Sequence, residues 1–256
     1  VMEGPPVLLG TIERASRGTP GHPGLINGAA LLRAGRADRI QGKRLLPSYD
    51  VFHEHRWFVP GAKTGTVTVA DRRVGLLVCE DLWDENYPIH PPAELVADGA
   101  ELLVCISSSP YRLGIHGRRL HHARRAGLPV VYVNAVGAND ELIFDGGSFA
   151  MSSRGIVTAE LPRFEEAVRV VDPFAQEAEG REPLEEPEEL FEALVTGVRD
   201  FARKNGLRRA VIGLSGGVDS ALVACIAREA IGPEWVTAVA IPSRFNDPRS
   251  TECARE

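Results

Sequence analysis

The stretch IGLSGGVDSA, residues 212–221, constrains the fold of this chain more than any other part of the sequence. An apolar run rich in branched residues leads straight into Gly216 and Gly217, and a helical pattern follows at once. The run EWVTAVAIPS (234–243) then predicts a second strand after that helix. Parallel strands need a crossover connection, which is usually a helix, because a tight hairpin cannot join them. The helix between these two strands therefore predicts that they pair in parallel. We therefore expect an α/β fold with a parallel sheet for this part of the chain.

The same stretch has the properties of an anion-binding loop. Its two glycines allow the backbone to approach an anion closely, and Ser215 and Ser220 add hydroxyl donors. The N-terminus of the following helix contributes a partial positive charge. Asp219 would repel a phosphate unless Mg²⁺ bridges the carboxylate and the phosphate oxygens. The alternative is a strand–turn–helix connection that binds nothing.

The first part of the chain has a different pattern, in which short β-rich runs alternate with turns and two helices. Predicted strands cover residues 6–13, 29–41, 66–79, 101–106 and 129–134, with hairpin turns at RAGRA and ADRR. Helical spacing covers residues 91–100 and about 118–126. The Arg-rich segment 117–127 is interpreted as the solvated face of that second helix. Strands and helices in this order predict α/β layering.

A segment rich in Glu and Pro, residues 173–187, is interpreted as a linker, although a polar surface loop would have the same composition. It separates a predicted first domain, residues 1–172, from residues 188–256. The second part begins with a helical pattern over residues 188–206, and a further helix starts near STECARE. One βαβ unit with a leading helix is too small to close a core of its own, so we expect the second domain to be cut short.

Composition excludes several classes of function. The formal net charge of −6 argues against a nucleic-acid-binding protein, which usually presents a basic face. No apolar run is long enough to span a bilayer, and the first ten residues lack the pattern of a signal peptide. The four cysteines show no CxxC spacing, which argues against a zinc site. Reduced cysteines and a cytoplasmic protein are expected.

Cys79 differs from an ordinary core cysteine. It ends the buried run GLLVC and is followed directly by Glu80 and Asp81, whereas Cys105 lies inside an apolar run as core cysteines do. A nucleophilic thiolate needs a nearby cation, because the two neighbouring acids oppose its formation. Lys43 offers one, as it leads the pattern Lys-x-x-Leu-Pro-x-Tyr, and Glu54 follows in Phe-x-Glu-x-Arg.

Two stretches resemble known families. GLSGGVDS resembles the pyrophosphate-binding loop of the ATP pyrophosphatase superfamily, which forms adenylates and releases pyrophosphate. AVAIPSRFNDPRSTECA (238–254) is similar to the segment that follows this loop in NAD synthetases, with Ile241 where those usually carry Met. The resemblance implies that ATP is bound by Gly213, Leu214, Ser215, Gly216, Gly217, Val218, Asp219 and Ser220, and Mg²⁺ by Asp219.

The segments around Cys79 and Lys43 resemble the nitrilase, or carbon–nitrogen hydrolase, family. The resemblance implies that Cys79 attacks the side-chain amide of glutamine, that Lys43 stabilises the oxyanion, and that Glu54 supports Lys43. It also implies glutamine contacts by Tyr49 and by Ser109 of SSSPYRLG. Ile115 stands where the family often carries Lys or Arg, a contact that Arg118 could replace by reaching back.

A nitrilase-like glutaminase placed before an SGGVDS domain is the arrangement of glutamine-dependent NAD synthetases. The resemblance implies a nitrilase-like αββα sandwich followed by the start of a Rossmann-like domain with a parallel sheet. It implies three substrates, glutamine, deamido-NAD and ATP, in a cytoplasmic homo-oligomer. The general-base Glu and the deamido-NAD site are expected outside this chain, which we interpret as truncated at both ends.

Two alternatives remain from the sequence. The chain could be a nitrilase-type amidase whose C-terminal βαβ unit is scaffold, in which case ATP has no effect on amide hydrolysis. It could also be a non-catalytic fragment that only binds ATP or assembles with partners.

Overall fold

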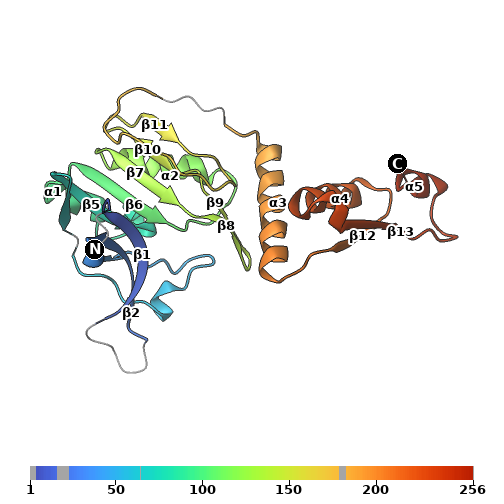
Figure 1. The fold of residues 1–256 in the computed structure, drawn as a ribbon, viewed down its shortest axis with the longest axis horizontal. Helices are drawn as coiled ribbons and strands as arrows, with labels where there is room; N and C mark the ends of the chain where they lie inside the picture. Colours follow the sequence, from blue (N-terminus) through green and yellow to red (C-terminus); the bar gives the residue numbers. More distant parts are fainter. Residues whose placement is uncertain (1–3, 16–22, 64, 179–182, 256) are drawn as a thin grey trace.

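The structure, a computed structural model, describes residues 4–15, 23–63, 65–178 and 183–255. It consists of a larger N-terminal lobe, the long helix α3 and a smaller C-terminal lobe, in that order along the longest axis (Figure 1). No helix in the described ranges is both long and apolar enough to cross a membrane.

The N-terminal lobe is built on a six-stranded sheet with the order β11-β10-β7-β6-β5-β4. Its strands are β4 (Thr66–Val69), β5 (Arg72–Val78), β6 (Leu102–Ser107), β7 (Val130–Asn134), β10 (Phe149–Met151) and β11 (Val157–Glu160). The central strands β5, β6 and β7 run parallel, whereas β4, β10 and β11 pair antiparallel. Because the carboxyl ends of parallel strands meet at one edge of a sheet, residues that follow β5, β6 and β7 lie near one another.

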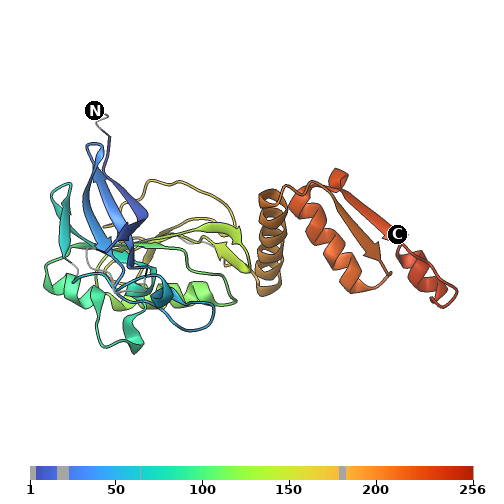
Figure 2. The same cartoon turned by 90° about the horizontal axis from the view of Figure 1, so that it is seen from below.

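Helices α1 (Pro91–Ala97) and α2 (Ile115–Arg125) cover one face of this sheet. Against the other face packs a three-stranded antiparallel sheet of β1 (Val7–Arg14), β2 (Leu25–Arg33) and β3 (Arg36–Gly42). Figure 2 shows the blue strands on the side of the sheet away from the teal and green helices. Leu77, Leu103 and Tyr132 fill the core on the helix side. Leu31, Val74 and Leu76 fill the core between the two sheets. The described residues thus give three layers, one of helices and two of strands.

Most of the predicted elements of this lobe are present. The turns at Ala34–Gly35 and at Ala70–Asp71 divide the predicted runs 29–41 and 66–79 into the hairpins β2–β3 and β4–β5. The sequence reasoning missed the strands after β7. The turn signals in AND and DGG mark the first of them, a hairpin of β8 (Val136–Asn139) and β9 (Leu142–Asp145).

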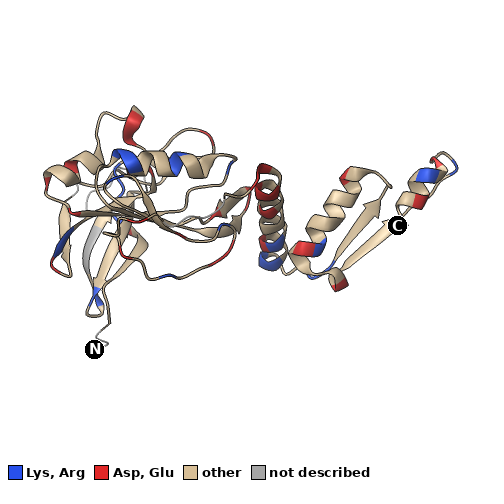
Figure 3. Cartoon of the chain, turned by 90° about the horizontal axis from the view of Figure 1, so that it is seen from above, with Lys and Arg blue, Asp and Glu red and all other residues tan. Residues whose placement is uncertain are grey.

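The C-terminal lobe contains the predicted βαβ unit. Its elements are β12 (Ala210–Leu214), α4 (Val218–Ile231), β13 (Val236–Ala240) and α5 (Pro248–Cys253), and β12 and β13 pair in parallel. The long helix α3 (Glu186–Lys204) precedes it and packs on α4 through Val195, Ile226 and Ala230. The same helix also contacts β8 and β9 of the N-terminal lobe. Figure 3 shows acidic residues toward one end of α3 and basic residues toward the other, as the helix dipole favours.

Candidate active site

Cys79 lies at the carboxyl end of β5, where the buried strand turns into the short 3₁₀ helix Cys79–Leu82. Its backbone φ is +46°, a left-handed conformation that is uncommon for a residue with a Cβ. Such strain persists where surrounding structure enforces it, and it is often found at functional sites. The turn presents Cys79 to a cavity of about 710 Å³.

Lys43 and Glu54 lie close enough to Cys79 for their charges to act on its thiol. Lys43 is almost completely buried, and its Nζ lies 2.6 Å from Glu54 Oε1. Burial alone would lower the pKa of Lys43, but the negative charges of Cys79 and Glu54 outweigh it and the pKa is raised. Lys43 therefore keeps its positive charge at neutral pH. Burial raises the pKa of the Cys79 thiol, and the Lys43 charge opposes that rise. The structure thus brings the three predicted catalytic residues together.

Asp81 is the residue that joins the Lys43 loop to the Cys79 turn. It is fully buried, and its Oδ1 accepts hydrogen bonds from the backbone N–H groups of Arg44 (2.9 Å) and Leu45 (3.0 Å). Its Oδ2 accepts from the N–H of Val78 at 3.1 Å. Burial raises the pKa of Asp81 to about 6, while these three N–H groups act in the opposite direction. One carboxylate therefore sets the separation of two catalytic segments.

Glu80 gives the cavity an acidic wall. The hydroxyl groups of Tyr49 and Tyr87 both donate to its carboxylate, each at 2.9 Å from Oε1. Burial raises the pKa of Glu80, and the two tyrosine hydroxyls oppose the rise. The predicted glutamine residue Tyr49 is thus on the cavity. From the sequence, Glu80 is only an acid beside Cys79. No sequence pattern indicates that the Tyr49 and Tyr87 hydroxyl groups contact it.

Ser109, the second predicted glutamine residue, lies on the loop after β6 and lines the same cavity. Its backbone N–H donates to Asn134 Oδ1 at 2.9 Å, at the end of β7. Ile115 and Arg118 also line the cavity, and the Arg118 guanidinium lies 5.7 Å from the centre of the Trp83 ring. Arg118 thus lines the same cavity as Ile115, the position at which the family often carries Lys or Arg.

The predicted anion loop lies in the C-terminal lobe, apart from the Cys79 cavity. The Ser215 and Ser220 hydroxyls lie 3.1 Å apart, and the Gly217 N–H donates to Ser215 Oγ at 3.2 Å. Gly216 has a φ of +82°, and a Cβ there would collide with the Ser250 carbonyl oxygen. A cavity of about 260 Å³ lies beside the loop, lined by residues that include Gly213, Leu214, Ser215, Asn246 and Ser250.

Asp219 stands in the first turn of α4 with an exposed side chain. The described residues contain no group of three or more His, Cys, Asp or Glu side chains that could hold a metal ion by themselves. A single carboxylate still fits Mg²⁺, because this ion keeps several waters and takes substrate phosphate oxygens as further ligands. The donor type therefore suits the predicted metal.

Comparison with known proteins places these observations in a family. The family model for carbon–nitrogen hydrolases matches residues 2–181. The chain belongs to the carbon–nitrogen hydrolase family. A second family model, NAD synthase, matches residues 190–256. The carbon–nitrogen hydrolase match covers the lobe that carries Cys79, Lys43 and Glu54, and the NAD synthase match covers the anion loop.

Some relatives match the N-terminal and C-terminal lobes of this chain in a single alignment. The chain is 39% identical to a glutamine-dependent NAD(+) synthetase of Synechocystis, over 97% of this chain and 48% of that protein. The solved structure of glutamine-dependent NAD⁺ synthetase from Acinetobacter baumannii in complex with ADP superposes with a TM-score of 0.89 at 32% identity, over 98% of this chain and 48% of that one. A carbon–nitrogen hydrolase from Helicobacter pylori shares the fold, with a TM-score of 0.51 at 22% identity over 61% of this chain and 57% of that one. The chain spans about half the length of the curated relatives it matches.

The interpretation of the Arg-rich segment of α2 as a solvated face is wrong at one residue. Arg118, Arg124 and Arg125 are exposed, but Arg119 is fully buried. Its guanidinium donates to the Ser109 carbonyl oxygen at 2.9 Å and pairs with buried Asp145. Only the arrangement of β9 beside α2 provides that partner, so the helical pattern alone could not reveal it.

Proposed function

We propose that the whole protein is a glutamine-dependent NAD synthetase. In this proposal residues 1–172 form the glutaminase domain, residues 173–187 a linker, and residues 188–256 the start of the ATP pyrophosphatase-type domain. The observation that carries the proposal is the cluster of Cys79, Lys43 and Glu54 at a cavity, in the same chain as the SGGVDS loop. The names of the relatives support it.

In the glutaminase reaction, the general-base Glu that the family resemblance places outside this chain takes the proton of the Cys79 thiol, and the sulfur attacks the side-chain carbonyl carbon of glutamine. A C–S bond forms, the carbonyl π electrons move to oxygen, and the Lys43 ammonium stabilises that oxyanion. Collapse of the adduct breaks the C–N bond, and the same base returns the proton to the nitrogen, which leaves as ammonia. Water then cleaves the thioester to glutamate. Glu54 holds Lys43 in place, and Tyr49 and Ser109 bind glutamine.

In the second reaction, ATP adenylates the nicotinic-acid carboxylate of deamido-NAD and pyrophosphate is released. Ammonia displaces AMP to give NAD. Ser215, Ser220 and the backbone N–H groups that begin α4 hold the pyrophosphate. Asp219 would hold Mg²⁺, which neutralises negative charge on the phosphate oxygens. The protein is thus a ligase that takes nitrogen from glutamine and requires ATP and Mg²⁺.

The proposal includes the setting in which the protein acts. All four cysteines are free thiols, which supports a reducing compartment and hence the cytoplasm. A homo-oligomer is proposed from the family resemblance, and sedimentation of the purified protein measures it.

Replacement of Cys79 tests the two-site assignment. Cys79→Ala in the whole protein should abolish NAD formation driven by glutamine and leave ammonia-driven formation within about twofold of the wild type, since the thiol serves only ammonia supply. Both rates are measured with the same enzyme preparation. Equal loss with the two nitrogen donors would overturn the assignment. If the wild-type protein hydrolyses glutamine but forms no NAD from either nitrogen donor, the protein is instead a simple amidase.

A further inference from the structure

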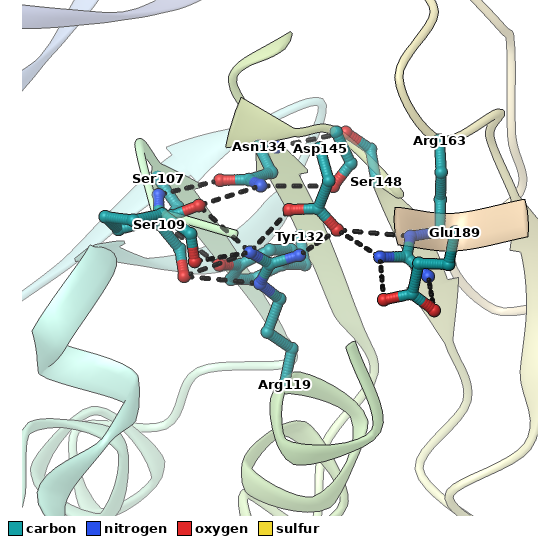
Figure 4. A network of polar contacts seen from close by, with 11 residues as sticks. Ser107, Ser109, Arg119, Tyr132, Asn134, Asp145, Ser148, Arg163 and Glu189 are labelled. Carbon is teal, nitrogen blue, oxygen red and sulfur yellow. Dashed lines mark hydrogen bonds and ion pairs between the residues drawn. The ribbon is translucent and has the colours of Figure 1, made fainter. Parts of the chain in front are cut away.

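A chain of alternating charges connects helix α3 to the cavity that contains Cys79 (Figure 4). It begins at Glu189, which lies on α3 and is only 9% exposed. A carboxylate buried to this extent needs a charged partner, because burial of an unpaired charge is strongly unfavourable. Arg163 supplies it in two places, with Nη1 at 2.7 Å from Oε2 and Nη2 at 2.9 Å from Oε1.

Arg163 also binds Asp145 at the end of β9. Its Nε and Nη2 donate to Asp145 Oδ2 at 3.1 and 3.0 Å. Asp145 is fully buried and accepts two more hydrogen bonds, from Arg119 Nη1 at 2.9 Å and Arg119 Nη2 at 2.8 Å. The same carboxylate therefore holds two guanidinium groups that come from different elements.

Arg119 forms the end of this chain at the cavity. Its Nη2 donates to the Ser109 carbonyl oxygen at 2.9 Å and lies 3.2 Å from Ser109 Oγ. With the Asn134 contact on its N–H, Ser109 has both of its backbone polar groups held by hydrogen bonds. The position of Ser109 in the cavity thus depends on where Arg119 is held.

The four charged groups balance one another. Glu189 and Asp145 carry two negative charges, and Arg163 and Arg119 carry two positive charges. Without the charge of Glu189, two guanidinium groups would share one carboxylate in a buried environment. Arg163 would then take a larger share of Asp145 or leave its place, and either change alters the support of Arg119.

A second contact joins the other end of α3 to the β8–β9 hairpin, the hairpin that ends at Asp145. Asp200 Oδ2 accepts a hydrogen bond from the Ala138 N–H of β8 at 2.8 Å. Gly137 has a φ of +118°, and a Cβ there would lie 2.6 Å from Asp200 Oδ2, so the approach is close. Leu142, on β9 of this hairpin, lines the Cys79 cavity. Both ends of α3 therefore hold a structure that forms part of the cavity wall.

We propose that Glu189 is a positioning residue for the glutaminase site, acting through Arg163, Asp145 and Arg119 to fix Ser109 beside Cys79. The inference rests on the proposed function, because it takes glutamine as the ligand of the cavity. It gives α3, which leads into the anion-loop lobe, an indirect role in glutamine binding. It also explains why Arg119 and Asp145 are buried as charged groups.

Protection of Cys79 from alkylation tests this proposal without requiring turnover. Purified protein is treated with iodoacetamide at increasing glutamine concentrations, and modification of each cysteine is followed by peptide mass spectrometry. The glutamine concentration that halves the rate at Cys79 gives an apparent dissociation constant. Cys225 is exposed and reports reagent activity, whereas Cys105 is buried and becomes reactive only if the fold opens.

Glu189→Gln should raise this dissociation constant by about tenfold, since it removes one partner of a buried ion pair. The rate at Cys79 without glutamine should stay within about twofold and Cys105 should stay unreactive, because the thiol site itself is unchanged. Glu188→Gln makes the same change at the exposed neighbouring residue and should bind glutamine like the wild type. The double variant Arg163→Gln/Glu189→Gln should bind no more weakly than Arg163→Gln alone, which shows that Glu189 acts through Arg163.

Four outcomes decide against the proposal. Wild-type affinity in Glu189→Gln overturns it and leaves the proposed function intact. An equal loss in Glu188→Gln also overturns it, since the effect would then come from charge on α3 in general. If Cys105 reacts in Glu189→Gln, the decision passes to Glu189→Asp, which keeps the charge but shortens the side chain. The proposal then requires that Glu189→Asp weaken glutamine binding about threefold while Cys105 stays unreactive. Wild-type affinity for glutamine in Glu189→Asp overturns the proposal. Absence of glutamine protection in the wild type overturns the proposed function, and this inference with it.

Discussion

Lys43 Nζ lies 2.6 Å from Glu54 Oε1, with the Lys43 side chain only 2% exposed. Glu54 is therefore the group that holds the Lys43 ammonium in position. Glu54→Gln keeps the size of the side chain and removes the charge, so the ammonium loses its fixed partner. We expect kcat for glutamine hydrolysis to fall by about 10²-fold, the scale for loss of an oxyanion donor, with little change in KM.

Steady-state release of ammonia measures this effect. Glu101→Gln is the matched control, because Glu101 pairs with Arg72 at the protein surface and not with Lys43. Normal turnover in Glu54→Gln would show that Lys43 needs no partner at this position.

The rate at which Cys79 is alkylated should depend on pH in a defined direction. Burial raises the pKa of Cys79, and Lys43 lowers it by stabilising the thiolate. The alkylation rate should therefore keep rising above about pH 8.5, the ordinary value for a cysteine thiol. Lys43→Met removes the cation and should move the profile to still higher pH. A profile that stays at the same pH in this variant would mean that Lys43 does not act on the thiol.

Asp81→Ala should destabilise the protein more than any change at an exposed acid. It leaves the backbone N–H groups of Arg44, Leu45 and Val78 without their acceptor. At about 1–3 kcal/mol for each unsatisfied buried donor, we expect a loss of at least about 3 kcal/mol in the free energy of unfolding. Urea denaturation measures it, and Asp219→Ala, at an exposed position, is the control.

The same variant has an expected pH dependence. The pKa of Asp81 in the folded protein, about 6, lies above its ordinary value of 3.8. The folded state therefore binds more protons than the unfolded state between these values, and the contribution of the group to stability is lost as pH rises through about 6. The deficit of Asp81→Ala should accordingly be larger at pH 4 than at pH 7. A deficit that shrinks on acidification would show that hydrogen bonding to the carboxylate outweighs its burial.

The sequence predicts the parts of the site that depend on local pattern. Cys79 could be singled out because it ends an apolar strand beside two acids, and the strand-loop-helix pattern located the anion loop. The family resemblance supplied Lys43 and Glu54, which stand 36 and 25 residues before Cys79.

What the sequence does not predict depends on the packing of distant elements. Arg119 has the spacing of a solvated helix residue, and only β9 brings Asp145 beside it. The buried carboxylate of Glu80 accepts hydrogen bonds from two tyrosines, Tyr49 and Tyr87, that lie on separate loops. The contact of Glu189 with Arg163 joins residues on either side of the predicted linker. No pattern within one segment contains this information.

Asp219→Asn tests the assignment of Mg²⁺ to the anion loop. The substitution keeps the size of the side chain and removes the charge that would bind the metal, while the hydrogen bonds among Ser215, Gly217 and Ser220 do not involve Asp219. The whole protein should lose NAD formation about 10²-fold with glutamine and with ammonia alike, because adenylation precedes the use of either. Calorimetry should show weaker ATP binding in the presence of Mg²⁺ and unchanged binding in its absence, and added Mg²⁺ should restore only part of the activity. If Asp219→Asn binds MgATP and forms NAD like the wild type, the loop holds pyrophosphate without a metal contact at this residue.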